Sequence, residues 1–151
     1  MADRPAFDTT KLRTADGILL IAGALYFIDS FLPWNRLCIK FATVSACGSA
    51  NLWHNVGILA ALLAIAVIAL AAVNLFSPSS MAVPPMVMPA LAAGILLFSI
   101  LKIIIDNDFL SYGAWVGLVL AVVIAYGGYQ KYAAAKGAPA APAAPPAPPT
   151  A

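Results

Sequence analysis

Four long, nearly uncharged apolar runs constrain this chain more than any other feature of its sequence. They cover about residues 17–34, 53–76, 83–105 and 109–132. A helix rises about 1.5 Å per residue, so about 20 residues cross the hydrocarbon core of a bilayer. Each run is near or above that length and is continuously apolar, whereas the strands of a membrane barrel alternate apolar and polar residues. The sequence therefore predicts an all-α integral membrane protein, a bundle of four transmembrane helices.

The composition agrees with a membrane protein and excludes several other classes. The chain has 151 residues, of which 63% are hydrophobic and 9% are charged. A soluble domain usually has about 25% charged residues, because polar groups must cover its surface. The eight basic residues are spread along the whole chain and the formal net charge is +2. No basic patch marks a nucleic-acid partner, and the expected surroundings are a lipid bilayer.

The chain divides into three predicted parts. Residues 1–15 are polar and form a short cytoplasmic segment, and residues 16–132 form the transmembrane domain. Residues 133–151 are rich in Ala and Pro and are predicted to be a disordered, extended tail. The letters GILL at 17–20 recur at 94–97. This repeat predicts two related helical hairpins, and the alternative is chance similarity between apolar helices.

Basic residues at the ends of the runs predict the orientation. If the N-terminus is cytoplasmic, five basic residues lie on the cytoplasmic side: Arg4, Lys11, Arg13, Lys131 and Lys136. The other three lie on or near the outer side: Arg36, Lys40 and Lys102. Cytoplasmic flanks carry the excess of Lys and Arg in membrane proteins. We therefore expect a multi-pass protein of the plasma membrane with both termini in the cytoplasm.

Aromatic residues gather at the predicted ends of the runs. Three tryptophans lie toward the outer ends: Trp34, Trp53 and Trp115. Three tyrosines lie toward the inner end of the fourth run: Tyr126, Tyr129 and Tyr132. Trp and Tyr are enriched where a membrane meets water. All six are predicted to be interface anchors.

Asp29 and Lys102 are the two charged residues well inside the apolar runs. A charge at the bilayer centre costs about 2.5–3.5 kcal/mol on insertion scales, and pairing removes much of that cost. Both residues have the same predicted depth, and each shares a helix face with a polar neighbour, Tyr26 or Ser99. This predicts an ion pair between the first and third helices. The alternatives are a local pair of Lys102 with Asp106 four residues later, a Lys102 that reaches the headgroups alone, and an ion or proton pathway.

Two cysteines, Cys38 and Cys47, lie in the predicted outer loop. Eight residues separate them, and an oxidising outer compartment favours a disulfide between them. Free thiols are one alternative. A Cys-Cys-His metal site with His54 is another, but these three residues lack the tight spacing of zinc fingers. The sequence therefore predicts a disulfide and no metal or cofactor.

Gly113 and Gly117 form a G-x-x-x-G pattern in the fourth run, which favours close helix packing. The sequence contains no P-loop, dinucleotide-binding or zincin motif. A catalytic pocket needs several polar groups brought together, and the runs offer few. We therefore predict that the protein is not an enzyme.

Several features together resemble a group of small four-helix membrane proteins from high-GC actinobacteria. They are the letters FLPW at 31–34, a Trp-containing loop, an Ala-rich second run and the Ala/Pro tail. The resemblance implies the four-helix architecture but no particular activity. The loop also resembles that of claudin-like tetraspans in Trp34, the two cysteines and the letters NLW at 51–53. In claudins the corresponding motif precedes the cysteines, so no residue role is carried over.

These patterns predict a non-catalytic accessory or scaffold subunit of a membrane or cell-envelope complex. Its partners would be other proteins in the membrane or further copies of itself. The alternative is a transporter or channel for ions or small solutes, built as a homo-oligomer. A channel predicts a polar stripe along at least one helix, and only the outer ends of the first and third runs show polar residues.

Overall fold

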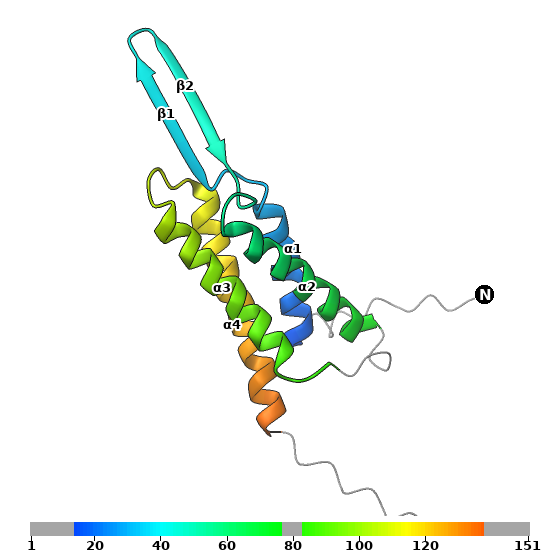
Figure 1. The fold of residues 1–151 in the computed structure, drawn as a ribbon. Coiled ribbons are helices and arrows are strands. Elements are labelled where there is room, and N and C mark those ends of the chain that lie inside the picture. Colours follow the sequence, from blue (N-terminus) through cyan, green and yellow to red (C-terminus); the bar gives the residue numbers. More distant parts are fainter. Residues whose placement is uncertain (1–13, 77–82, 138–151) are drawn as a thin grey trace, which may run out of the picture.

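The computed structural model is a bundle of four helices with a two-stranded hairpin extending from one end (Figure 1). It describes residues 14–76 and 83–137. The helices are α1 (Ala15–Asp29), α2 (Gly57–Phe76), α3 (Val87–Ile105) and α4 (Tyr112–Gly137). The strands are β1 (Asn35–Phe41) and β2 (Val44–Ala50). Consecutive helices pack against each other and α4 packs against α1, so the four helices close into a ring.

Three of the helices, α2, α3 and α4, are long and apolar enough to cross a membrane, with 20, 19 and 26 residues. The chain is therefore a small multi-pass membrane protein. Helix α1 has 15 residues and ends at Asp29, five residues before the predicted end of the first run. The chain leaves the helix through a turn in which the N–H of Leu32 donates to the carbonyl of Asp29. Pro33 follows, and proline has no N–H to continue a helix.

The remaining helix boundaries also differ from the predicted runs. Helix α3 begins at Val87 rather than near residue 83, after Pro84 and Pro85, because each proline disfavours the helical conformation of the residue before it. Helix α4 continues to Gly137, past the predicted end at 132, through alanines with high helix propensity. The first five residues of the predicted tail are therefore helical. The rest of the tail and residues 1–13 lie outside the described residues.

The interior of the bundle is built mainly from small side chains, which let the helices approach closely. Helix α2 contributes four fully buried alanines: Ala60, Ala61, Ala64 and Ala71. Larger buried side chains fill the remaining space, and they include Leu19, Tyr26, Trp34, Leu52 and Ile124. Two of these, Trp34 and Leu52, come from the segments that join the hairpin to the bundle.

Polar groups join three helices at the end of the bundle opposite the hairpin. Lys131 of α4 pairs with Asp16 of α1 at 2.6 Å. The side-chain amide of Asn74 in α2 donates to the same Asp16 carboxylate at 3.4 Å. Thr14 caps α1 by accepting the N–H of Gly17. Helix α1 starts and α4 ends at this same end (Figure 1).

The hairpin corrects the all-α prediction, because the predicted outer loop between the first and second runs contains two strands. Apolar residues occupy every second position of β1, at Leu37, Ile39 and Phe41. This period of two is the spacing of a strand with two unlike faces. The turn between the strands is tight and places Ala42 at a φ of 51°, the left-handed conformation that such turns require. The alternation is visible in the sequence, but it covers only the few residues of β1.

Candidate functional site

The hairpin has one apolar face and one basic face. β1 and β2 are antiparallel with seven residue pairs, from Asn35 opposite Ala50 to Phe41 opposite Val44. Residues directly opposite each other share a face, and successive pairs alternate between faces. The apolar face therefore consists of Leu37, Ile39, Phe41, Val44, Ala46, Gly48 and Ala50, with Asn35 at its base. The basic face consists of Arg36, Lys40, Ser45, Ser49 and the pair Cys38–Cys47.

Large side chains of the apolar face are exposed. Phe41 is 81% exposed and Val44 is 68% exposed, while Ile39 and Leu37 are 55% and 43% exposed. An isolated exposed apolar residue is ordinary, but a contiguous apolar patch marks an interaction site. The four residues share one face of a ribbon that stands clear of the helices (Figure 1).

The predicted disulfide between Cys38 and Cys47 is present, and it joins the two strands at the middle of the hairpin. The two residues are directly opposite each other, with a Cα–Cα distance of 4.1 Å. The bond fixes the register of the strands, since a slip by one residue would exchange the two faces. Both sulfurs are used, so neither is a thiolate ligand. The described residues contain no group of three His, Cys, Asp or Glu side chains placed to hold a metal ion.

The base of the hairpin is held by backbone hydrogen bonds. The N–H of Trp34 donates to the carbonyl of Ala50 at 2.9 Å, and the N–H of Ser111 donates to the carbonyl of Trp34 at 2.8 Å. The N–H of Arg36 donates to the carbonyl of Phe109 at 2.9 Å. Residues just before α4 thus pair with the outer edge of β1. The hairpin is therefore fixed to the bundle rather than attached through a free loop.

Trp34 is completely buried, so it is a core residue and not the interface anchor that was predicted. Its indole N–H donates to the carbonyl of Asp29 at 3.3 Å. Its ring lies against Gly113 and Gly117 of α4, and a Cβ on Gly117 would overlap the ring. The G-x-x-x-G pattern therefore makes room for an indole at the contact between α1 and α4.

The other predicted anchors lie at the surface to different degrees. Trp115, Tyr126 and Tyr129 are all more than half exposed, whereas Trp53 and Tyr132 are partly buried. The indole N–H of Trp53 donates to the hydroxyl of Ser30 at 3.1 Å, which ties Trp53 to the end of α1. Their role as membrane anchors stays a prediction.

Helices α1 and α3 lie diagonally across the ring and are joined by a buried hydrogen bond. The hydroxyls of Tyr26 and Ser99 are 2.6 Å apart, and both side chains are fully buried. Ser99 donates its proton to the carbonyl of Ile95 at 2.7 Å, which leaves Tyr26 as the donor to Ser99. The polar faces proposed for the first and third helices thus meet inside the bundle.

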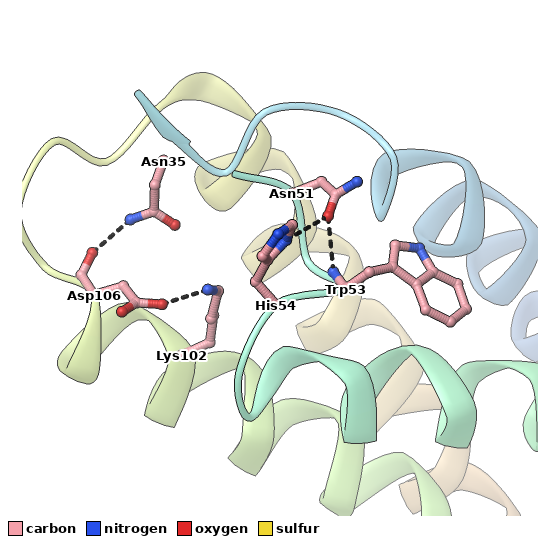
Figure 2. Close-up of polar contacts among 6 residues, drawn as sticks. All are labelled: Asn35, Asn51, Trp53, His54, Lys102 and Asp106. Atoms are coloured by element: carbon pink, nitrogen blue, oxygen red, sulfur yellow. Dashed lines mark hydrogen bonds and ion pairs between the residues drawn. The ribbon is translucent and has the colours of Figure 1, made fainter. Parts of the chain in front are cut away.

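Lys102 pairs with Asp106 on the same helix, four residues away, and not with Asp29 (Figure 2). Asp29 and Lys102, the two residues of the predicted interhelical ion pair, are both buried. Neither carboxylate oxygen of Asp29 has a hydrogen-bond partner among the described residues. The local alternative is therefore the one present. The reason is geometric, since a lysine reaches one turn along its own helix without crossing the bundle. Asp29 lies instead beside Gly117 of α4.

An open pocket of about 400 Å³ lies between the base of the hairpin and the ends of α2 and α3. Lys102 and Asp106 line it, together with Asn35 and His54. Figure 2 shows the side-chain amide of Asn35 donating to the carbonyl of Asp106, at 2.6 Å, and His54 beside Asn51, at 3.1 Å. The side chain of Asn35 thus connects the base of the hairpin to Asp106 at the end of α3.

No protein-family model, curated protein or solved structure matches the chain. The candidate functional site therefore rests on its own geometry. It is the hairpin, with an exposed apolar face, a basic face and a base fixed to the bundle.

Proposed function

We propose that this protein is a non-catalytic accessory or scaffold subunit of a membrane or cell-envelope complex, and that the hairpin is its docking element. The observation that carries the proposal is the exposed apolar face of the hairpin, with Phe41 and Val44 at its tip. Exposed apolar surface of this kind is costly in water and is retained where a partner covers it. The disulfide and the fixed base support the proposal, because a preorganised surface loses little entropy on binding.

The arrangement of charges supports a non-catalytic role. Lys102 and Asp106 neutralise each other, and Tyr26 and Ser99 bond to each other. An active site needs such groups aimed at a substrate instead.

The positions of the buried polar side chains argue against the alternative that the protein is a channel. The buried polar side chains of the described residues lie toward the hairpin end, at Tyr26, Asp29, Ser30, Ser99 and Lys102. Buried residues toward the other end are apolar, such as Leu19, Val67 and Ile124. A continuous polar stripe through the bundle would have favoured conduction.

The proposed location is the plasma membrane with both termini in the cytoplasm. The disulfide supports this orientation, because disulfides persist in oxidising compartments outside the cytoplasm. The distribution of Lys and Arg supports the same orientation.

The proposal is tested by gentle extraction of the tagged, full-length protein from its native membranes, followed by native sizing and identification of what co-purifies. We expect a defined assembly larger than the monomer, which Phe41→Ser dissociates. Lys40→Ser, one residue away on the basic face, is the matched control and should leave the assembly intact. A lone monomer in wild-type membranes would contradict the accessory role.

A further inference from the structure

We propose that the occupant of the apolar face is a second copy of this chain, so that two hairpins pack face to face above the membrane. This inference rests on the proposed function, because it names the partner of the same docking element. It is carried by the separation of the two faces, by the position of the hairpin relative to the bundle, and by the size of the apolar face.

The segments of the chain outside the described residues are attached to the bundle at the end away from the apolar face. The three such segments, 1–13, 77–82 and 138–151, join the helices at the start of α1, between α2 and α3, and at the end of α4. These attachment points all lie at the end of the bundle opposite the hairpin (Figure 1). The membrane-spanning part of the bundle therefore separates them from the apolar face.

Lipid is not the occupant either. The hairpin continues outward from the bundle in roughly the direction of the helices (Figure 1). A strand rises about 3.3 Å per residue, so a seven-residue strand carries its tip about 20 Å beyond its base. With the bundle across the bilayer, Phe41 and Val44 at the tip lie beyond the level at which the hairpin leaves the bundle, where a partner that projects from the same membrane can meet them.

A second copy matches the face in both height and chemistry. A twofold axis along the membrane normal makes both hairpins project the same way and sets identical surfaces opposite each other. Leu37, Ile39 and Phe41 of one copy then face the same residues of the other at equal height. Arg36 and Lys40 lie on the opposite face of each ribbon, so they point away from the contact and stay in water. Face-to-face packing therefore buries apolar side chains without bringing like charges together.

The size of the face also favours a partner held in the same membrane. With roughly 200 Å², the area of an aromatic side chain, as an upper value for each, the four large side chains together expose at most about 500 Å². A stable complex between freely diffusing proteins buries about 800 Å² on each partner. Two copies in one bilayer are already oriented and concentrated relative to each other, so a smaller contact suffices.

Photo-crosslinking on the two faces tests the inference. A benzophenone amino acid is placed at position 41 in one variant and at position 40 in another, and the purified, full-length proteins are reconstituted in liposomes at low protein density. We expect a crosslinked dimer from position 41 at several times the yield from position 40. Ile39→Ser in the position-41 variant should reduce that yield severalfold. Each variant is also run on a gel with and without reductant. A variant whose mobility does not change on reduction no longer forms the Cys38–Cys47 disulfide.

The remaining outcomes separate this inference from the proposed function. Equal dimer yields at the two positions, or no dimer from position 41, overturn the face-to-face contact. The same variants are then irradiated in native membranes. Crosslinks from position 41 to a different protein alone would overturn the second copy as occupant and leave the accessory role standing. A lone monomer without crosslinks in those membranes would overturn both.

Discussion

At the scale of single residues, Trp34 determines how the hairpin joins the bundle. It is fully buried and its ring fits against Gly113 and Gly117. The same residue exchanges backbone hydrogen bonds with Ala50 and Ser111, one in β2 and one at the start of α4. One side chain thus links the packing of the helices to the position of the strands.

Gly117→Ala is expected to destabilise the bundle by about 1–3 kcal/mol, because the added methyl group would overlap the Trp34 ring and approach Asp29. Gly137→Ala in the same helix is the control, since no heavy atom lies within 4 Å of a Cβ there. Thermal unfolding in detergent, followed by circular dichroism, compares the two. Equal melting temperatures would show that Trp34 does not pack as described.

Asp106→Asn is expected to destabilise the protein by up to about 3 kcal/mol, because it leaves the buried Lys102 ammonium without its partner. Lys102→Met should cost much less, since it removes the buried charge and keeps the apolar stem. The double variant should resemble Lys102→Met alone. Free energies of unfolding in detergent measure these differences.

Asp29→Asn tests the interhelical alternative in the same assay. Neither carboxylate oxygen of Asp29 has a hydrogen-bond partner among the described residues, so the effects of Asp29→Asn and Lys102→Met should add within about 0.5 kcal/mol. A clear departure from additivity between Asp29 and Lys102 would restore the interhelical ion pair.

At the scale of elements, the hairpin and the bundle should differ in what stabilises them. The helices are held by close packing of small residues, whereas a two-stranded hairpin alone is at best marginally stable in water. The Cys38–Cys47 bond is therefore expected to matter for the hairpin and little for the helices.

Replacing both Cys38 and Cys47 with Ser should release the hairpin and leave the bundle intact. In the chain-entropy model a disulfide that closes so short a loop contributes about 3 kcal/mol. We expect chymotrypsin to cleave at Phe41 much faster in the variant, while the helical circular dichroism and its melting temperature stay unchanged. Wild-type protein treated with reductant should behave like the variant. Equal cleavage of the oxidised wild type and the variant would rule out this role.

At the scale of the whole molecule, the up-and-down order of the helices places the hairpin at one end of the bundle and both the start of α1 and the end of α4 at the other (Figure 1). An epitope tag inserted between Ala42 and Thr43 should be reached by antibody on intact cells. A tag after Ala151 should require permeabilised cells. If antibody reached both tags from the same side of the membrane, the prediction that all four helices cross it would be wrong. If antibody reached the tag after Ala151 on intact cells but the hairpin tag only after permeabilisation, only the predicted orientation would be wrong.

Much of the architecture was predictable because it depends on long, repeated signals. The runs from which α2, α3 and α4 form are apolar over about 20 residues, which is the length a bilayer requires. The Cys38–Cys47 bond followed from two cysteines in one predicted outer loop. The contact between the polar faces of α1 and α3 was visible as Tyr26 and Ser99 at helical spacing from the buried charges.

Features that depend on short or competing signals were missed. The alternation in β1 extends over only seven residues and follows directly on an apolar run, so the sequence alone predicts a loop there. Trp34 stands at the edge of that run, where a membrane anchor and a core residue look the same in sequence. The sequence offers two carboxylates as partners for Lys102, those of Asp29 and Asp106. Lys102 pairs with Asp106 because that residue lies one helical turn away.

The sequence by itself determined that this is a helical membrane protein with a disulfide-bonded loop, since hydrophobic length and cysteine content act without reference to the rest of the fold. Only the tertiary structure decided that the loop is a ribbon with an apolar and a basic face, that Trp34 anchors it, and that Asp29 and Lys102 do not meet. Each of these depends on which residues lie opposite one another in space, and strand register and helix packing set that.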